Sequence, residues 1–335
     1  MFSVPKLNEE KRRTQHEPIR TPSICFSALR AIRPFRVGID LSTSLFWFFV
    51  VRCNGCPVDG MRTFDPHRSF TYKSQGAASG FVANFRTDHY ERNGSILGYR
   101  GADYMVIDLE EHGTDDRRFF IFSLVTAIQG EDQTVDPMGR KQDGRIGLSL
   151  NSTATLDLLF LNYDRLLCMG RNREGKPWLT IGQSACSERK KFDDYVNLTS
   201  VVVLTDGWTI AVQRLTWDDD FEAQLSTTTS YLNARSDIVE AIARQLSAVQ
   251  QPDGRYFVDC SFQSSIPKLS FKINGVDMEI KKKFIVETSF DVCELKLRPT
   301  YNRVELTLGL PFMDSFISCL DFDERMVSFM RSLKS

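Results

Sequence analysis

Residues 35–56 read FRVGIDLSTSLFWFFVVRCNGC. Apolar residues alternate along 35–39 and lead into a single acidic residue, Asp40. Such alternation predicts a half-buried strand, and the apolar run over 45–51 predicts a second one. A carboxylate between two strands is costly to bury unless neighbouring hydroxyl and N–H groups satisfy it, and the small polar cluster at 42–44 supplies such groups. Taken alone, the stretch predicts a polar turn between two strands.

A similar pattern occurs in the second half of the chain. Residues 223–230 read AQLSTTTS, which is again an apolar lead-in followed by small hydroxyl residues. After each copy comes a short apolar-glycine element, RIGL at 145–148 and TLGL at 307–310. A pattern that recurs once per half predicts two related lobes that meet at their hydroxyl-rich loops.

This layout resembles the pepsin-like aspartic peptidases, in which each of two lobes brings one Asp-Thr-Gly-Ser/Thr loop to a shared cleft. The resemblance implies a mostly β, bilobal double-β-barrel fold with a few short helices. We expect a polar N-terminal arm over residues 1–23, an N-terminal lobe over 24–176 and a C-terminal lobe over 177–335. The resemblance covers roughly residues 24–331, and its cleft-forming parts have a general likeness to nematode members of the family.

The resemblance also assigns candidate site residues. Asp40 matches the first catalytic aspartate, and Ser226 stands where the second is expected. Tyr90 matches the tyrosine of the flap hairpin over the cleft, and Asn93-Gly94 is in itself a two-residue hairpin signal. The alternative for Tyr90 is a hairpin tyrosine without a role in the site. The residues that match the supporting positions of the two loops are Thr43, Thr227 and Thr229.

Two cysteine pairs are expected to form disulfides. Cys53 and Cys56 are two residues apart; a zinc site would need a second close pair, and a thioredoxin-type motif would need a following helix. A small loop disulfide remains, and the family has one at this place. The resemblance also makes Cys293 the partner of Cys260. At most one further pair is expected among Cys25, Cys168, Cys186 and Cys319.

Composition limits the classes of partner. The chain has 335 residues, 25% charged residues and a formal net charge of −1. This balance favours neither nucleic acid nor an anionic membrane surface. No apolar run approaches the length that spans a bilayer. We expect a monomer without metal or cofactor, and the resemblance implies a peptide or protein ligand in the interlobe cleft.

The compartment is indicated by two conflicting signals. Eight cysteines and sequons at Asn93, Asn151 and Asn197 fit an oxidising, glycosylating compartment, which the resemblance specifies as secreted or lysosomal. The N-terminal residues, however, are charged and lack the apolar stretch of a secretory signal peptide. We expect that a signal has been lost from this N-terminus; the alternative is a cytosolic protein with chance sequons.

The catalytic chemistry of the family needs two carboxylates that share one proton across a bound water. Here Leu41 and Ser42 replace the threonine and glycine of the first loop, and Ser226 and Thr228 replace the aspartate and glycine of the second. A serine hydroxyl cannot share a proton in this way, and no histidine lies in either loop to activate it. The sequence therefore predicts a proteolytically inactive homologue that binds a peptide or protein. The alternatives are an active or weakly active endopeptidase that uses Asp40, and a chain without selected activity.

Two local features add structural expectations. Arg145 replaces an apolar residue in the family's DGIlGL motif, which predicts a charge near the core of the N-terminal lobe. Ser236 precedes the apolar face of a predicted helix, where a serine is a plausible N-cap.

Overall fold

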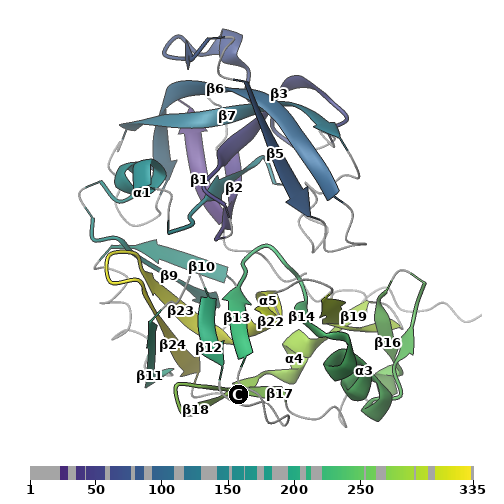
Figure 1. Ribbon diagram of the computed structural model, residues 1–335. Coiled ribbons are helices and arrows are strands. Elements are labelled where there is room, and N and C mark those ends of the chain that lie inside the picture. The colour runs from purple at the N-terminus through teal and green to yellow at the C-terminus, as the bar shows by residue number, and fades with distance from the viewer. Residues whose placement is uncertain are drawn as a thin grey trace, which may run out of the picture.

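The structure is a computed structural model that folds into two lobes, with the N-terminal half in one and most of the C-terminal half in the other (Figure 1). It describes residues 23–28, 35–41, 43–56, 61–76, 80–86, 93–108, 117–129, 142–150, 153–161, 163–171, 177–182, 195–203, 209–212, 221–252, 254–261, 269–289, 292–300 and 306–332. Among these residues no helix is long and apolar enough to cross a membrane.

The N-terminal lobe is a closed β-barrel. Its strands follow the order β1-β2-β8-β3-β7-β6, and β6 pairs again with β1, which closes the sheet on itself. β4 and β5 also pair with β6. The strands are β1 (Ser23–Ala28), β2 (Phe35–Asp40), β3 (Phe46–Asn54), β4 (Lys73–Ser74), β5 (Gly80–Arg86), β6 (Asn93–Asp108), β7 (Arg117–Gln129) and β8 (Gly144–Gly147). The helical elements are η2 (Pro66–Arg68) and α1 (Thr153–Leu159).

The described part of the C-terminal half forms four sheets. One has the order β10-β9-β23-β24-β11, with β9 (Leu166–Arg171), β10 (Pro177–Ile181), β11 (Tyr195–Val203), β23 (Phe316–Asp321) and β24 (Met326–Ser332). The second has the order β12-β13-β22-β14-β21, with β12 (Thr209–Val212), β13 (Phe221–Leu225), β14 (Leu232–Arg235), β21 (Leu297–Thr300) and β22 (Leu306–Leu308).

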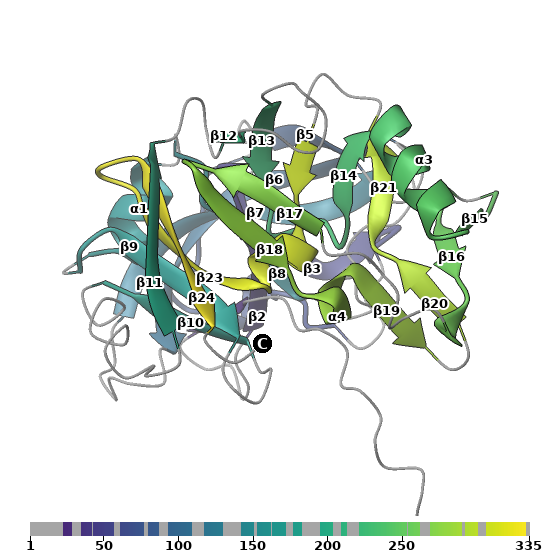
Figure 2. The same ribbon diagram turned by 90° about the horizontal axis from the view of Figure 1, so that it is seen from below.

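The two smaller sheets complete this half. One is β15-β16-β20-β19, with β15 (Val249–Gln250), β16 (Tyr256–Val258), β19 (Val286–Ser289) and β20 (Val292–Leu295). The other is the hairpin of β17 (Leu269–Ile273) and β18 (Val276–Ile280), which lies in the foreground of Figure 2. The helices are α3 (Ser236–Gln245), α4 (Lys282–Ile285) and α5 (Leu310–Met313).

The two lobes repeat one arrangement of strands around their hydroxyl-rich loops. In the N-terminal lobe, β8 pairs parallel to β2 and antiparallel to β3, and β3 pairs parallel to β7. In the C-terminal lobe, β22 pairs parallel to β13 and antiparallel to β14, and β14 pairs parallel to β21. The mostly β, pepsin-like bilobal fold predicted from the repeated loops is therefore confirmed.

The apolar run in β3 is buried on both faces. Phe46 and Phe48 pack into the main core, whereas Trp47 and Phe49 belong to a second cluster with Ile96. A strand that is covered on both sides reads as a continuous apolar run rather than as an alternation. In β2 only one face is apolar, which explains the alternation that ends at Asp40.

Two local expectations are wrong. Ser236 is the first residue of α3 rather than its N-cap; Arg235 occupies the cap position and makes no side-chain cap bond. Asn93-Gly94 is not a turn, because Asn93 pairs with Arg86 and Gly94 pairs with Phe85 inside the β5–β6 hairpin.

β9, which we expected at the end of the N-terminal lobe, pairs with β23 and β10. The domain boundary at 176/177 stays a prediction.

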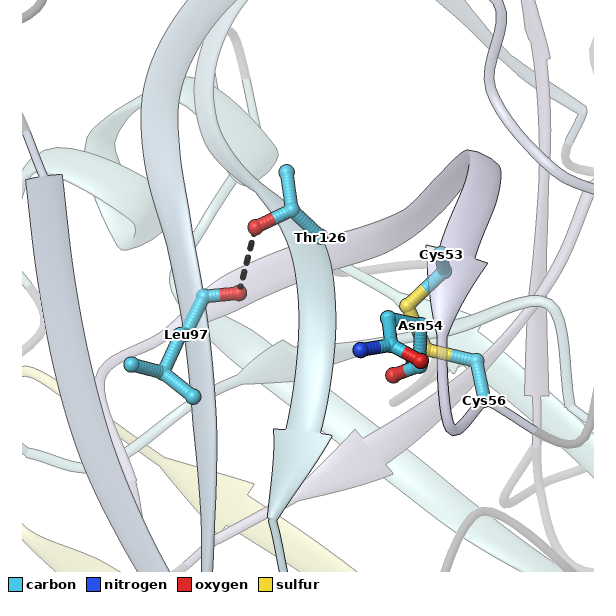
Figure 3. The surroundings of a disulfide bond; sticks show 5 residues. All are labelled: Cys53, Asn54, Cys56, Leu97 and Thr126. Atoms are coloured by element: carbon cyan, nitrogen blue, oxygen red, sulfur yellow. Dashed lines mark hydrogen bonds between the residues drawn. A yellow bond between two sulfur atoms is a disulfide. The ribbon is translucent and has the colours of Figure 1, made fainter.

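Three disulfides join the described cysteines. Cys53–Cys56 and Cys260–Cys293 have Cα separations of 5.5 and 5.3 Å, within the range that a disulfide spans. The first closes the loop after β3, beside Leu97 and Thr126 of the neighbouring strands (Figure 3). The third pair is Cys168–Cys319, which joins directly paired residues of β9 and β23 and is buried. Cys186 lies outside the described residues, as does the side chain of Cys25.

A group of charges, of which Lys296 and Arg298 are buried, surrounds Tyr231 at the start of the strand that follows the second loop. The Tyr231 hydroxyl donates to Glu294 Oε1 at 2.5 Å and accepts from Arg298 Nη2 at 3.1 Å. The Arg298 guanidinium also lies 4.0 Å from the centre of the tyrosine ring. Lys296 Nζ lies 3.2 Å from the same glutamate and 2.5 Å from Glu287. Burial, followed by the charge of Glu294, raises the pKa of Tyr231 well above its ordinary value.

The Cys168–Cys319 disulfide should contribute more stability than the Cys53–Cys56 disulfide. The sequence separations are 151 and 3 residues, and the loop-closure entropy removed from the unfolded chain grows with loop length. Replacing both cysteines of the long-range pair by alanine should lower the free energy of unfolding by about 5 kcal/mol, against about 1.6 kcal/mol for the short-range pair. Denaturant unfolding of the two double variants measures this. A larger loss in the Cys53/Cys56 variant would contradict the prediction.

Tyr231 should make stability fall at alkaline pH. Because its pKa is raised in the folded state, its contribution is complete below the ordinary tyrosine pKa of about 10 and is lost as pH rises above that value. Tyr231→Phe should be less stable than the wild type at pH 8, because the buried Arg298 and the half-buried Glu294 each lose a hydrogen bond. The gap should narrow by about 1.4 kcal/mol per pH unit above pH 10. Denaturant titrations from about pH 8 to about pH 11 check this; a gap that stays constant would contradict it.

Candidate functional site

The first loop begins where β2 ends, at Asp40. The residue is 6% exposed, and its carbonyl oxygen accepts a 2.8 Å hydrogen bond from the N–H of Leu148. β2 lies parallel to β8, with Asp40 opposite Gly147. The apolar lead-in and the glycine element seen in the sequence are therefore neighbouring strands that hold the aspartate between them.

The second loop begins where β13 ends, at Ser226. Its N–H donates to the carbonyl of Leu308, at the end of the parallel strand β22, at 3.1 Å. Its hydroxyl accepts from the N–H groups of Thr228 and Thr229, both at 3.3 Å. The hydroxyl also lies 3.3 Å from the Thr228 hydroxyl. The Ser226 side chain, which we predict to stand at the position of the second carboxylate, thus bonds within its own loop.

The two loops share their local geometry. In the first, Thr43 Oγ1 accepts from the N–H of Leu45 at 3.1 Å. In the second, Thr229 Oγ1 accepts from the N–H of Tyr231 at 3.3 Å. Each threonine follows the first residue of its loop by three positions, so the two turns correspond residue by residue. This correspondence supports the alignment of Asp40 with Ser226.

A glycine packs against the backbone of each loop. A Cβ atom added to Gly147 would lie 2.4 Å from the carbonyl oxygen of Thr43. One added to Gly309 would lie 2.2 Å from the carbonyl oxygen of Tyr231. Real Cβ atoms do not approach backbone oxygens so closely, so both positions require glycine. The repeated apolar-glycine element of the sequence has a structural cause.

The loops of the two lobes touch through Thr227. Thr227 is 2% exposed, and its hydroxyl donates a 2.7 Å hydrogen bond to the carbonyl oxygen of Ile39. Ile39 directly precedes Asp40, and Thr227 directly follows Ser226. The position equivalent to Thr227 in the first loop is Leu41, which is 2% exposed and belongs to the hydrophobic core. Because leucine has no hydroxyl, it cannot return the bond.

Arg145 lies beside Asp40. Its Nη1 is 3.7 Å from Asp40 Oδ2, and the two side chains are 21% and 8% exposed respectively. We expected this arginine to place a charge near the core of the lobe. The structure instead pairs it with the candidate catalytic aspartate. The sequence contained a signal, an arginine in an apolar motif two residues before Gly147, but only the register of β2 on β8 shows where it points.

Two of the predicted positions cannot be placed. Tyr90 and Ser42 lie outside the described residues, so the role of Tyr90 over the site stays a prediction. Around the site, the described residues supply one carboxylate, one guanidinium and several hydroxyl groups. No group of three metal-ligating side chains occurs in the described part of the chain.

Loss of the Thr227 hydroxyl should weaken the junction between the lobes. Thr227→Val keeps the shape of the side chain but leaves the buried Ile39 carbonyl without this donor, which typically costs about 1–3 kcal/mol. The matched control is Thr228→Val, one residue along the same loop, whose half-buried hydroxyl lies 3.3 Å from the hydroxyl of Ser226. Denaturant unfolding should show a clearly larger loss for Thr227→Val. Equal losses in the two variants would refute a special role for this bond.

Comparison with known proteins gives matches over both halves. A family model described as eukaryotic aspartyl protease matches residues 183–332, which include Ser226 but not Asp40. Gastricsin from Suncus murinus is 24% identical over 88% of this chain and 77% of its own length. Chymosin from Callithrix jacchus is 23% identical over 89% and 77%, and pregnancy-associated glycoprotein 2 from Bos taurus is 20% identical over 88% and 77%.

The repeated strand arrangement, the corresponding loops and these matches agree with one another. The matches to relatives extend over most of the chain and therefore into both halves, whereas the family model matches only the second. The chain is therefore a homologue, at low sequence identity, of the pepsin-like aspartic peptidases.

Proposed function

We propose that this homologue binds a peptide or a segment of a protein between its lobes and does not cleave it. The observation that carries the proposal is Ser226, which stands at the position of the second carboxylate. A hydroxyl does not ionise at acid pH and cannot share a proton with Asp40 as a carboxylate does. The Ser226 hydroxyl also accepts hydrogen bonds from two N–H groups of its own loop, which hold the oxygen in place.

The surroundings of Asp40 support the same proposal. Acid proteolysis of this type needs a water that is polarised between two acidic groups. Asp40 faces the Arg145 guanidinium at 3.7 Å instead of a second carboxylate. The only other side chains that the described parts of the loops bring to the site are hydroxyl and apolar ones.

The contacts that hold the two loops, which we call the frame of the site, support a binding role. Both glycines and the two threonine turns are kept, and Thr227 still joins the loops. In a peptidase this frame aligns an extended peptide with the catalytic groups, and alignment does not depend on a second carboxylate. The relatives include gastricsin and chymosin, and the matching family is a protease family, which makes a peptide the favoured class of ligand.

An active endopeptidase is the second candidate. Its support is Asp40 itself, which is retained and held at the end of β2 by the same backbone bonds that position the loop. This candidate would need an acid or base to replace the missing carboxylate, and none lies in the described part of the second loop.

The compartment and the assembly are part of the same proposal. Three disulfides fit an oxidising environment, so we propose a secreted or lysosomal protein. We further propose that it acts as a monomer, because both loops of the site belong to one chain.

The unmodified protein should not cleave peptides at acid pH. One positioned acid or base contributes ~10²–10⁴-fold to rate, and misplacement of the remaining groups by ~1 Å adds a further loss. Incubation with quenched-fluorescent peptides from about pH 2 to about pH 6 measures cleavage. Robust cleavage that is abolished by Asp40→Asn would sink the proposal and establish the second candidate.

Restoring the loop residues tests the cause of inactivity. Ser226→Asp alone should recover little, because the bulkier loop residues still hold the two groups apart. Ser226→Asp together with Leu41→Thr, Ser42→Gly and Thr228→Gly should recover some cleavage, and Asp40→Asn in that background should remove it again.

Binding is tested separately with a random octapeptide library selected against the immobilised wild type. Enriched peptides should bind in a one-to-one ratio and remain intact. A selection that enriches no peptide would instead favour a chain without selected activity.

A further inference from the structure

The charge that faces Asp40 comes from the adjacent strand of its own lobe. β2 and β8 are parallel, with Gly38 opposite Arg145 and Asp40 opposite Gly147. Side chains alternate along β8, so that Ile146 is buried in the core and Arg145 lies on the other face of the sheet. Along β2 the same alternation buries Ile39 and puts Asp40 on that other face. Register and alternation together aim the guanidinium at the carboxylate.

Burial makes a partner necessary for Asp40. Its side chain is 8% exposed, and a covered carboxylate is costly unless it is paired or hydrogen-bonded. In the described parts of the two loops, 40–41, 43–45 and 226–230, Asp40 is the only charged side chain. From β3, Phe46 and Trp47 bring no titratable group. Arg145, on β8, is therefore the charged group that faces it from the described elements packed around the site.

We propose that Arg145 has taken the place of the second carboxylate as the group that balances Asp40. In an aspartic dyad a shared proton relieves the repulsion of two carboxylates. Here a guanidinium, which stays protonated throughout the pH range of folded proteins, opposes the charge directly. Arg145 is thus a positioning residue: it holds Asp40 in an ion pair rather than in a proton-sharing arrangement. This inference deepens the proposed function, on which it rests for the absence of a second acid at Ser226.

A double-mutant cycle tests the pair. Asp40→Asn and Arg145→Met each remove one charge and keep much of the volume. Because each variant breaks the ion pair, each should lower the melting temperature by about 5 °C. The double variant should lose clearly less than the sum of the two, because the same pair is lost only once.

Two further measurements separate ion pairing from simple packing. Arg145→Lys, which keeps a cation, should retain part of the coupling, whereas a packing effect of the arginine would not depend on the charge. The matched control is the Arg235–Asp237 pair, which is closer, at 2.8 Å, but more exposed, at 37% and 62%. Its cycle should show almost no coupling.

The outcomes distinguish this inference from the proposed function. Additive losses for Asp40→Asn and Arg145→Met, or a coupling that Arg145→Lys abolishes completely, would overturn the role of Arg145 and leave the absence of cleavage as it stands. Cleavage by the unmodified protein would overturn the proposed function and leave the measured coupling unaffected. Coupling that Arg145→Lys partly keeps and that the Arg235–Asp237 cycle lacks would establish the pair.

Discussion

The hydrogen bond from the Thr227 hydroxyl to the Ile39 carbonyl is the contact on which the geometry of the site depends. It joins the residue before Asp40 to the residue after Ser226, so it fixes the two loops relative to each other across the junction of the lobes. The bond is buried, and water therefore competes with it little. It runs in one direction only, because Leu41 occupies the reciprocal position and packs into the core. In the described residues, the junction therefore has this bond in one direction.

The backbone hydrogen bonds that hold the two loops do not involve the side chains of Asp40 and Ser226. The backbone bonds that hold each loop involve Leu148, Leu308 and Leu310, and they do not require an acid at either candidate position. Gly147 and Gly309 are required by contacts with backbone oxygens and are equally independent of catalysis. At the two candidate positions, the Asp40 carboxylate faces a guanidinium, and the Ser226 hydroxyl bonds to its own turn. The backbone hydrogen bonds and glycine contacts that hold the two loops therefore do not depend on which side chains stand at positions 40 and 226.

The strands and glycines that support the two loops could be predicted from the sequence, because each of them has a local sequence pattern. Alternation in β2, the continuous apolar run of β3 and the paired glycine elements each have a local physical cause. The partner of Arg145 could not be predicted, since it depends on the register between strands more than a hundred residues apart. The Cys168–Cys319 disulfide was left open for the same reason. Ser236 failed as a cap because composition suggests a cap residue but only the backbone conformation selects it. Tyr90 stays a prediction.

The buried charges around Tyr231 show that polar groups are retained away from the site as well as in it. Lys296 and Arg298 are almost fully buried, and each lies against the ring of Tyr231 and close to one or more acceptors. Such a group contributes little net stability compared with apolar packing, but it penalises any arrangement in which a partner is missing. Tyr231 directly follows the second loop, so a displaced loop would break this network. The second loop is therefore fixed at both of its ends. Thr227 bonds to Ile39 at one end, and Tyr231 bonds to Glu294 and Arg298 at the other.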